Sequence, residues 1–169
     1  LVMPDAWGQQ APSDSPFTPP QAKLQYAPDR DYDLQHIAVD LTIDDAKHSF
    51  QGVVVNTLAP LREGLTTLRF DCGENLSVTA CEIDGRQAGF SHEGESLKVT
   101  APEPLLPGKP VVVTVRYFDS GKKELAHFHW HKPTPAEPQR IGFWTAGEPY
   151  FNRQWLPTWD YPNDFATTE

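Results

Sequence analysis

Residues 37–43 read Ile37-Ala38-Val39-Asp40-Leu41-Thr42-Ile43, and their large apolar side chains recur at every second position. Side chains on a β-strand alternate between the two faces of a sheet, so this period of two predicts a half-buried strand. The residues that follow, 44–47, are typical of a turn. The valine-rich stretch 50–58 comes next, and we expect it to return as the second strand of a hairpin.

Short apolar stretches and turn residues continue along the chain. Asp84-Gly85 predicts a tight hairpin turn, and Pro102–Pro110 is expected to form a proline-rich connection. No window has the 3.6-residue repeat of an amphipathic helix. Strands of this length and spacing predict an all-β fold, either a β-sandwich or an open curved sheet. The further strands that we expect lie at Leu68–Phe70, Leu76–Ile83, Gln87–His92, Ser96–Val99 and Val111–Tyr117.

The length of 169 residues is that of a single domain preceded by a tail. Residues 1–31 are rich in proline and are expected to be a tail or linker, while 32–169 form the β-rich domain. Ala6-Trp7-Gly8 has small residues two apart, as at a signal-peptidase site, which slightly favours an exported protein and otherwise leaves the localisation open. The sequence has no run of ~18 apolar residues, the length needed to span a membrane as a helix.

The net charge of −9 argues against binding to nucleic acid, because a duplex is itself a dense row of negative charge. Cys72 and Cys81 have the wrong spacing for a zinc site or a redox pair. We interpret them as two small core residues on neighbouring strands, and a disulfide remains an alternative if the chain is exported. Asn75-Leu76-Ser77 is a glycosylation sequon that matters only in a eukaryotic secretory route.

The C-terminal part carries a more specific pattern. It reads Trp144-Thr145-Ala146-Gly147-Glu148-Pro149, then Asn152-Arg153, Trp155-Leu156-Pro157 and Asp160-Tyr161-Pro162-Asn163-Asp164. Together with the upstream motifs Phe50-x-Gly52 and Leu68-x-Phe70-Asp71, this pattern resembles the end of the N-terminal domain in the aminopeptidase N family of zinc metallopeptidases, the gluzincins. The resemblance covers roughly residues 34–169.

The resemblance implies a saddle-shaped domain of curved antiparallel sheets, truncated here at its C-terminal end, that contributes to the substrate cleft of an aminopeptidase. Its expected partners are the catalytic domain of the same polypeptide and a peptide substrate. The catalytic domain would supply the His-Glu-x-x-His zinc ligands, which do not occur in this sequence. We therefore expect zinc in the parent hydrolase and neither a cofactor nor peptidase activity in this fragment alone.

One substrate-binding position can be carried over from the resemblance. Glu148 is expected to bind the free α-amine of the substrate, with Ala146 and Gly147 beside it. A carboxylate that pairs with an ammonium group in a cleft recognises the end of a peptide. The family has a glutamine where Ala146 stands, and this departure leaves the specificity and the activity of the parent open.

The remaining polar residues of the motif are interpreted as structural. Arg153, Asp160 and Asn163 are expected to tie loop backbone together. Pro157 and Pro162 are expected to fix the same loop, and either could follow a cis peptide bond.

The alternation His127-Phe128-His129-Trp130-His131 brings three imidazoles to one face of an extended strand. Three histidines can bind a transition metal, but neighbours on one strand rarely converge on one ion, so they are weak candidates. The alternative is a hairpin strand whose aromatic side chains face inward. A stand-alone β-sandwich that binds peptides or glycans is the competing interpretation of the whole chain.

Overall fold

The structure is a computed structural model of the chain, and it describes residues 26–121 and 127–169. The signal-peptidase-like Ala6-Trp7-Gly8 lies outside these residues. Apart from one 3-10 turn, the described residues contain strands and loops, which confirms the prediction of an all-β fold. The elements are β1 (Tyr32–Asp44), β2 (Ser49–Pro60), β3 (Leu65–Asp71), β4 (Leu76–Ile83), β5 (Arg86–Glu93), β6 (Ser96–Leu105), β7 (Val111–Asp119), β8 (Phe128–Trp130), β9 (Phe143–Thr145), η1 (Asn152–Gln154) and β10 (Thr167–Thr168).

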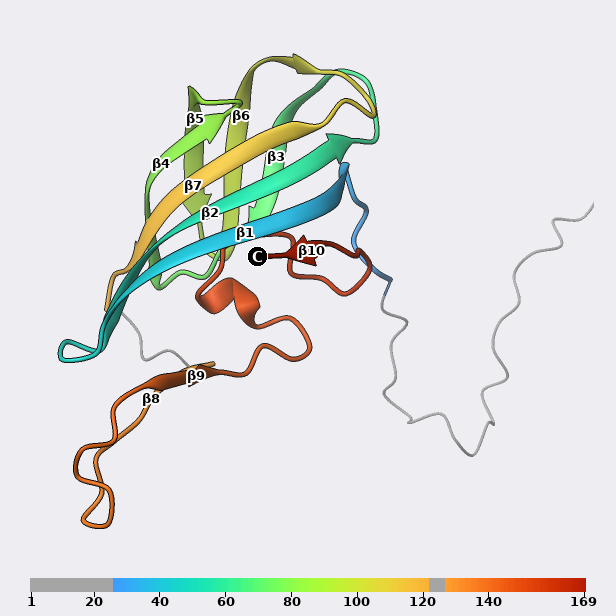
Figure 1. The fold of residues 1–169 in the computed structure, drawn as a ribbon. Helices are drawn as coiled ribbons and strands as arrows, with labels where there is room; N and C mark the ends of the chain where they lie inside the picture. The colour runs from blue at the N-terminus through green and yellow to red at the C-terminus, as the bar shows by residue number, and fades with distance from the viewer. Residues whose placement is uncertain (1–25, 122–126) are drawn as a thin grey trace, which may run out of the picture.

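Eight strands form one sheet in the order β10-β1-β2-β7-β4-β5-β6-β3, and β8 pairs with β9 in a separate ribbon. Neighbours are antiparallel except for β10, which runs parallel to β1. Figure 1 shows the ribbon beneath the sheet, with η1 between the two. The hairpins predicted around residues 44–47 and at Asp84-Gly85 both form.

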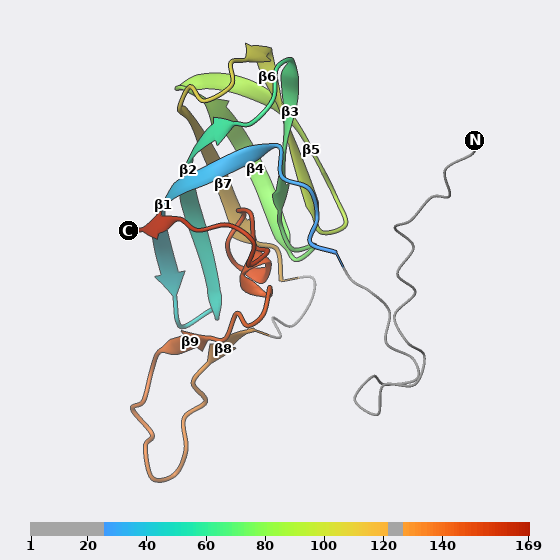
Figure 2. The same ribbon diagram turned by 90° about the vertical axis from the view of Figure 1, so that its right-hand side faces the viewer.

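The sheet curls so strongly that its two ends approach each other, as the view in Figure 2 shows. Tyr32 on β1 lies 5.6 Å from Phe70 on β3, measured between ring centroids, and its hydroxyl donates a hydrogen bond to the Arg69 carbonyl at 2.6 Å. The apolar faces of six of the seven long strands meet inside this curl, and β5 adds only the partly buried Ala88. One continuous core therefore forms within a single bent sheet.

Two bulges explain a phase change in the sequence pattern. On β1 the residues that face the core have even numbers up to Leu34 and odd numbers from Ile37 onward. The register with β2 shifts between Leu34 and His36. A bulge inserts one extra residue, so the apolar side chains on both sides of it reach the same face. β4 has the same irregularity between Val78 and Ala80.

Gly52 in the Phe50-x-Gly52 motif makes room for a tyrosine ring. A Cβ atom at this position would lie 2.6 Å from Cζ of Tyr117 and 2.8 Å from a methyl group of Leu41. The buried Tyr117 therefore packs directly on the β2 backbone. This contact gives a physical reason for the glycine in the Phe50-x-Gly52 motif.

The prediction that Pro102–Pro110 forms a connection was wrong in its first half, because β6 continues through Pro102 and Pro104 to Leu105. Proline is tolerated here since the register with β3 jumps from the Thr67–Thr100 pair to the Leu65–Leu105 pair. Residues 101–104 lie in this irregularity, where the ladder needs no N–H donor.

Candidate functional site

The segment that carries the family motif begins on β9, whose position the ribbon fixes. Phe128 pairs with Thr145, and the N–H of Ala146 donates to the carbonyl of His127 at 3.0 Å. Phe128 is buried and stacks on Phe50 of the sheet at 4.8 Å between centroids. The ribbon is thus attached to the core through an aromatic side chain, as the alternative interpretation of the histidine-rich stretch predicted.

Gly147 packs against η1. A Cβ atom on it would overlap the side chain of Asn152, and its carbonyl accepts the N–H of Phe151 at 2.8 Å. A larger residue would have to displace the Asn152 side chain. The close approach and the hydrogen bond hold Gly147, the neighbour of Glu148, against the start of η1.

Glu148 is exposed, as is Ala146 two residues earlier. Within residues 26–121 and 127–169 the Glu148 carboxylate forms no ion pair, including with Arg153, whose charged partners lie elsewhere. The peptide bond between Glu148 and Pro149 is cis. The suggestion that Pro157 or Pro162 follows a cis bond was wrong, because both of those bonds are trans.

Arg153 anchors the loop that follows. Its guanidinium lies 3.2 Å from Asp71 at the end of β3, 3.3 Å from Asp160 and 3.6 Å from Glu95, measured between nitrogen and oxygen. Its side chain is only 15% exposed, and its Nε also donates to the carbonyl of Tyr150 at 3.0 Å. Its own carbonyl accepts the N–H of Gly73 at 2.7 Å. One side chain therefore joins η1 to three other parts of the chain.

The two buried carboxylates around Arg153 also hold backbone groups. Asp71 accepts the N–H of Asp160 at 3.0 Å, and Asp160 accepts the N–H of Arg153 at 3.0 Å. Asp71 and Thr158 exchange backbone hydrogen bonds in an isolated bridge. Burial raises the pKa of Asp160, and the hydrogen bonds and charge of Arg153 oppose this shift. Each carboxylate satisfies donors that would otherwise be buried without a partner.

Asn163 has the tying role predicted for it. Its side-chain oxygen accepts the indole N–H of Trp159 at 2.8 Å, and its amide donates to the carbonyl of Pro28 at 3.1 Å. Sequence reasoning missed the fully buried Asn56, which accepts the hydroxyl of Thr158 at 2.7 Å and donates to the carbonyl of Pro157 at 3.2 Å. A single polar residue at an inward position of a valine-rich strand was the available signal.

The three candidate metal ligands of the ribbon have separate surroundings. The ring of His127 stacks on Phe151 and that of His129 on Trp144, each at 3.9 Å between centroids, and the backbone N–H of His131 donates to the Gly142 carbonyl. Across the described part of the chain, no three His, Cys, Asp or Glu side chains come together as metal ligands. The donor set in these residues therefore does not fit a catalytic zinc.

Cys72 and Cys81 are buried, unpaired core residues, in agreement with the favoured interpretation of the sequence. They do not lie on neighbouring strands, because Cys72 follows the end of β3, Cys81 is on β4, and these two strands are not adjacent in the sheet. Burial raises the pKa of each thiol to about 12. Thiolates are the reactive form of cysteine, so neither side chain is prepared for catalysis or metal binding.

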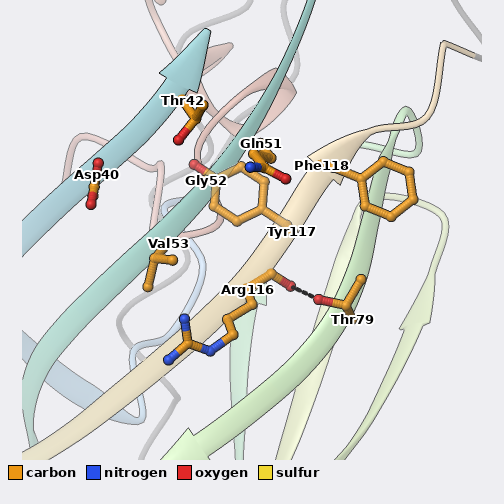
Figure 3. A pocket seen from close by; sticks show the side chains of 9 residues that line it. All are labelled: Asp40, Thr42, Gln51, Gly52, Val53, Thr79, Arg116, Tyr117 and Phe118. Atoms are coloured by element: carbon orange, nitrogen blue, oxygen red, sulfur yellow. Dashed lines mark hydrogen bonds between the residues drawn. The ribbon is translucent and has the colours of Figure 1, made fainter.

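A second surface feature is a hollow of about 310 Å³ on the outer face of β1, β2, β7 and β4. Figure 3 shows the polar side chains of Asp40, Gln51 and Arg116 around it, and Phe118 at one side. Arg116 already lies 3.8 Å from Glu82. The hollow belongs to the opposite face of the sheet from the buried core and is separate from the Glu148 loop.

No helix in the described residues is long and apolar enough to cross a membrane. A scan against protein-family models and a search of curated proteins each found no match.

Solved structures do resemble the chain. The M1 zinc metallopeptidase from Deinococcus radiodurans matches with a TM-score of 0.65 and 26% identity, over 83% of this chain and 32% of that one. A variant of a two-domain M1 zinc metallopeptidase bound to L-tryptophan matches with a TM-score of 0.66 and 26% identity, over 83% and 32% of the two chains. Leukotriene A4 hydrolase from Saccharomyces cerevisiae, at 21% identity over 82% and 22% of the two chains, shares the fold with a TM-score of 0.69.

The chain spans about a third of the length of the Deinococcus enzyme and less than a quarter of the yeast enzyme. Its fold is that of the N-terminal portion of the M1 zinc metallopeptidases, the family that its C-terminal motif predicted.

Proposed function

We propose that this chain is the non-catalytic N-terminal domain of a zinc-dependent aminopeptidase, and that its Glu148 loop contributes the part of the cleft that binds the α-amine of a peptide substrate. The observation that carries the proposal is the contrast between this carboxylate and its surroundings. Arg153, Asp160 and Asn163 all bond within the domain, whereas Glu148 is exposed and has no ion pair among the described residues.

An unpaired carboxylate on an anchored loop is suited to recognise an ammonium group. The loop geometry is set beforehand by Gly147 and Arg153, so binding would order few further groups. A variant of an M1 zinc metallopeptidase in this fold group has been solved with L-arginine, a ligand with a free α-amine. This supports the class of ligand that we assign to Glu148.

The exposed aromatic side chains next to Glu148 support contact with a further domain. Phe143, Trp144 and Tyr150 are 40%, 49% and 39% exposed, and they flank Glu148 in the chain. Aromatic residues are enriched where protein surfaces meet. The catalytic domain of the same polypeptide would cover them and would supply the zinc ligands, because the described residues of this chain do not fit the metal.

The proposal is tested in the complete polypeptide with Glu148→Ala and Glu148→Gln. Removing one partner of a desolvated charge pair costs about 2–5 kcal/mol, so affinity for free-amine substrates should fall by tens-fold or more. N-acetylated competitors carry no ammonium and should lose much less. Equal losses for both ligand types would show that Glu148 acts on the fold and not on the amine.

The chain by itself should have no aminopeptidase activity. Zinc-dependent turnover of an aminoacyl anilide by the purified 169-residue chain would overturn the assignment of the zinc to another domain. If instead the complete polypeptide lacks a zinc-binding domain and the chain binds peptides or glycans alone, the competing binding-module interpretation holds.

A further inference from the structure

The outer face of β3 and β6 brings two positive charges together. Arg69 and Lys98 are directly opposite each other in the antiparallel register, and both are exposed. Opposite residues have Cβ atoms about 4.5–5.5 Å apart, and like charges at such positions destabilise a sheet. This arrangement costs stability and calls for a reason beyond the fold.

Neither cation is neutralised by a residue that the structure describes. Among the described residues, no carboxylate forms an ion pair with the side chain of Arg69 or of Lys98, although the chain has 23 acidic residues against 14 basic ones. A nearby arginine behaves differently: Arg62 pairs with Asp31. The unpaired cations are therefore a local feature and do not reflect a shortage of acidic residues.

The surface around these cations is concave and polar. Arg69 and Lys98 line a hollow of about 400 Å³ together with the hydroxyl-bearing Thr66 and Thr67. The other charged lining residues are the paired Arg62 and Asp31, and Glu63. Three cations and two carboxylates leave the hollow with a net charge of +1, in a protein whose net charge is −9.

We propose that this hollow binds a small ligand that carries a tetrahedral oxyanion, either free phosphate or the phosphate of a small monoester. A guanidinium such as that of Arg69 presents a planar fork that matches two oxyanion oxygens, and an ammonium such as that of Lys98 adds a point charge. The threonine hydroxyls beside them can donate to the remaining oxygens. The ligand would relieve the repulsion between the two cations.

Binding is measured by titrating the ¹⁵N-labelled 169-residue chain with inorganic phosphate at fixed ionic strength and following the amide chemical shifts. The expected result is saturable shifts confined to residues 64–69 and 98–100. A parallel titration with a sugar phosphate distinguishes free phosphate from a phosphate monoester as the ligand. Tighter binding of the monoester than of free phosphate would show that its organic part also contacts the hollow. Shifts that do not saturate, or that centre elsewhere, would overturn the proposal.

Variants test the charges one at a time, and each must have a melting temperature no lower than that of the wild type. Arg69→Gln and Lys98→Gln should each weaken phosphate binding about fivefold, and Glu63→Gln should tighten it, since it removes a negative charge from the lining. Arg86→Gln is the matched control: it removes one positive charge from β5, where Arg86 lies 3.7 Å from Glu103. If Arg86→Gln weakens phosphate binding equally, the binding depends only on the overall charge of the protein, and the proposed site is refuted.

Discussion

Replacing Arg153 by methionine removes the charge at the centre of the C-terminal anchor and keeps much of its apolar volume. The change leaves Asp71 and Asp160 without their cation, and their side chains are only 10% and 4% exposed. Breaking a buried ion pair by removing one partner costs about 3–5 kcal/mol. Because Arg153 is itself 15% exposed and its third partner Glu95 is 48% exposed, we expect the lower end, about 3 kcal/mol.

The loss is read from urea unfolding followed by tryptophan fluorescence, since Trp155 and Trp159 lie in the anchored segment. For a chain of this size, 3 kcal/mol corresponds to a fall in melting temperature of roughly 6–12 °C. Arg116→Met is the matched control. Arg116 is 52% exposed and 3.8 Å from Glu82, so its loss should cost less than about 1 kcal/mol.

A double-mutant cycle identifies the cause. If the cost comes from an uncompensated carboxylate, Asp160→Asn should be less destabilising, by about 1 kcal/mol, in the Arg153→Met background than in the wild type. The reasoning is refuted if Arg153→Met costs no more than Arg116→Met, or if the two changes at 153 and 160 are additive.

Four further outcomes follow from the fold. Gly52→Ala should lower the free energy of unfolding by about 1–3 kcal/mol, because the new methyl group meets the Tyr117 ring and the core has no space for it. Tyr117→Phe should leave stability unchanged or raise it in the same urea assay, since the buried hydroxyl has no hydrogen-bond partner among residues 26–121 and 127–169. A chromogenic disulfide reagent should react with Cys72 and Cys81 only after unfolding, given that both thiols are buried with a pKa of about 12; fast labelling of the folded chain would contradict this. Burial raises the pKa of Asp160 above the ordinary 3.8, so the folded state takes up this proton before the unfolded chain does. The stability of the wild type relative to Asp160→Asn should therefore increase as the pH falls toward 3.8, and a pH-independent difference would show that Asp160 does not titrate in this way.

The local pattern predicted the long strands because each has one face in the core. The alternation in 37–43, the valines of β2 and β7, and the turn at Asp84-Gly85 all became strands and hairpins where expected. A period of two is a direct consequence of burial on one face, so it can be read without knowing which strands are neighbours. The same reading missed the second half of β6, since prolines normally interrupt a ladder and only the register with β3 shows that these prolines fall where the ladder is already irregular.

The motif around Glu148 predicted the family fold, but its geometry depends on residues far away in the sequence. The sequence by itself determined most of each long strand, the turns and the polar residues that tie the loop around Arg153, Asp160 and Asn163. Only the tertiary structure decided that Arg153 meets Asp71 and Glu95, that β10 lies parallel to β1, and that Arg69 faces Lys98. The physical reason is that apolar alternation and turn formation are local properties of the chain, whereas charge pairing, strand order and register depend on how the whole sheet curls.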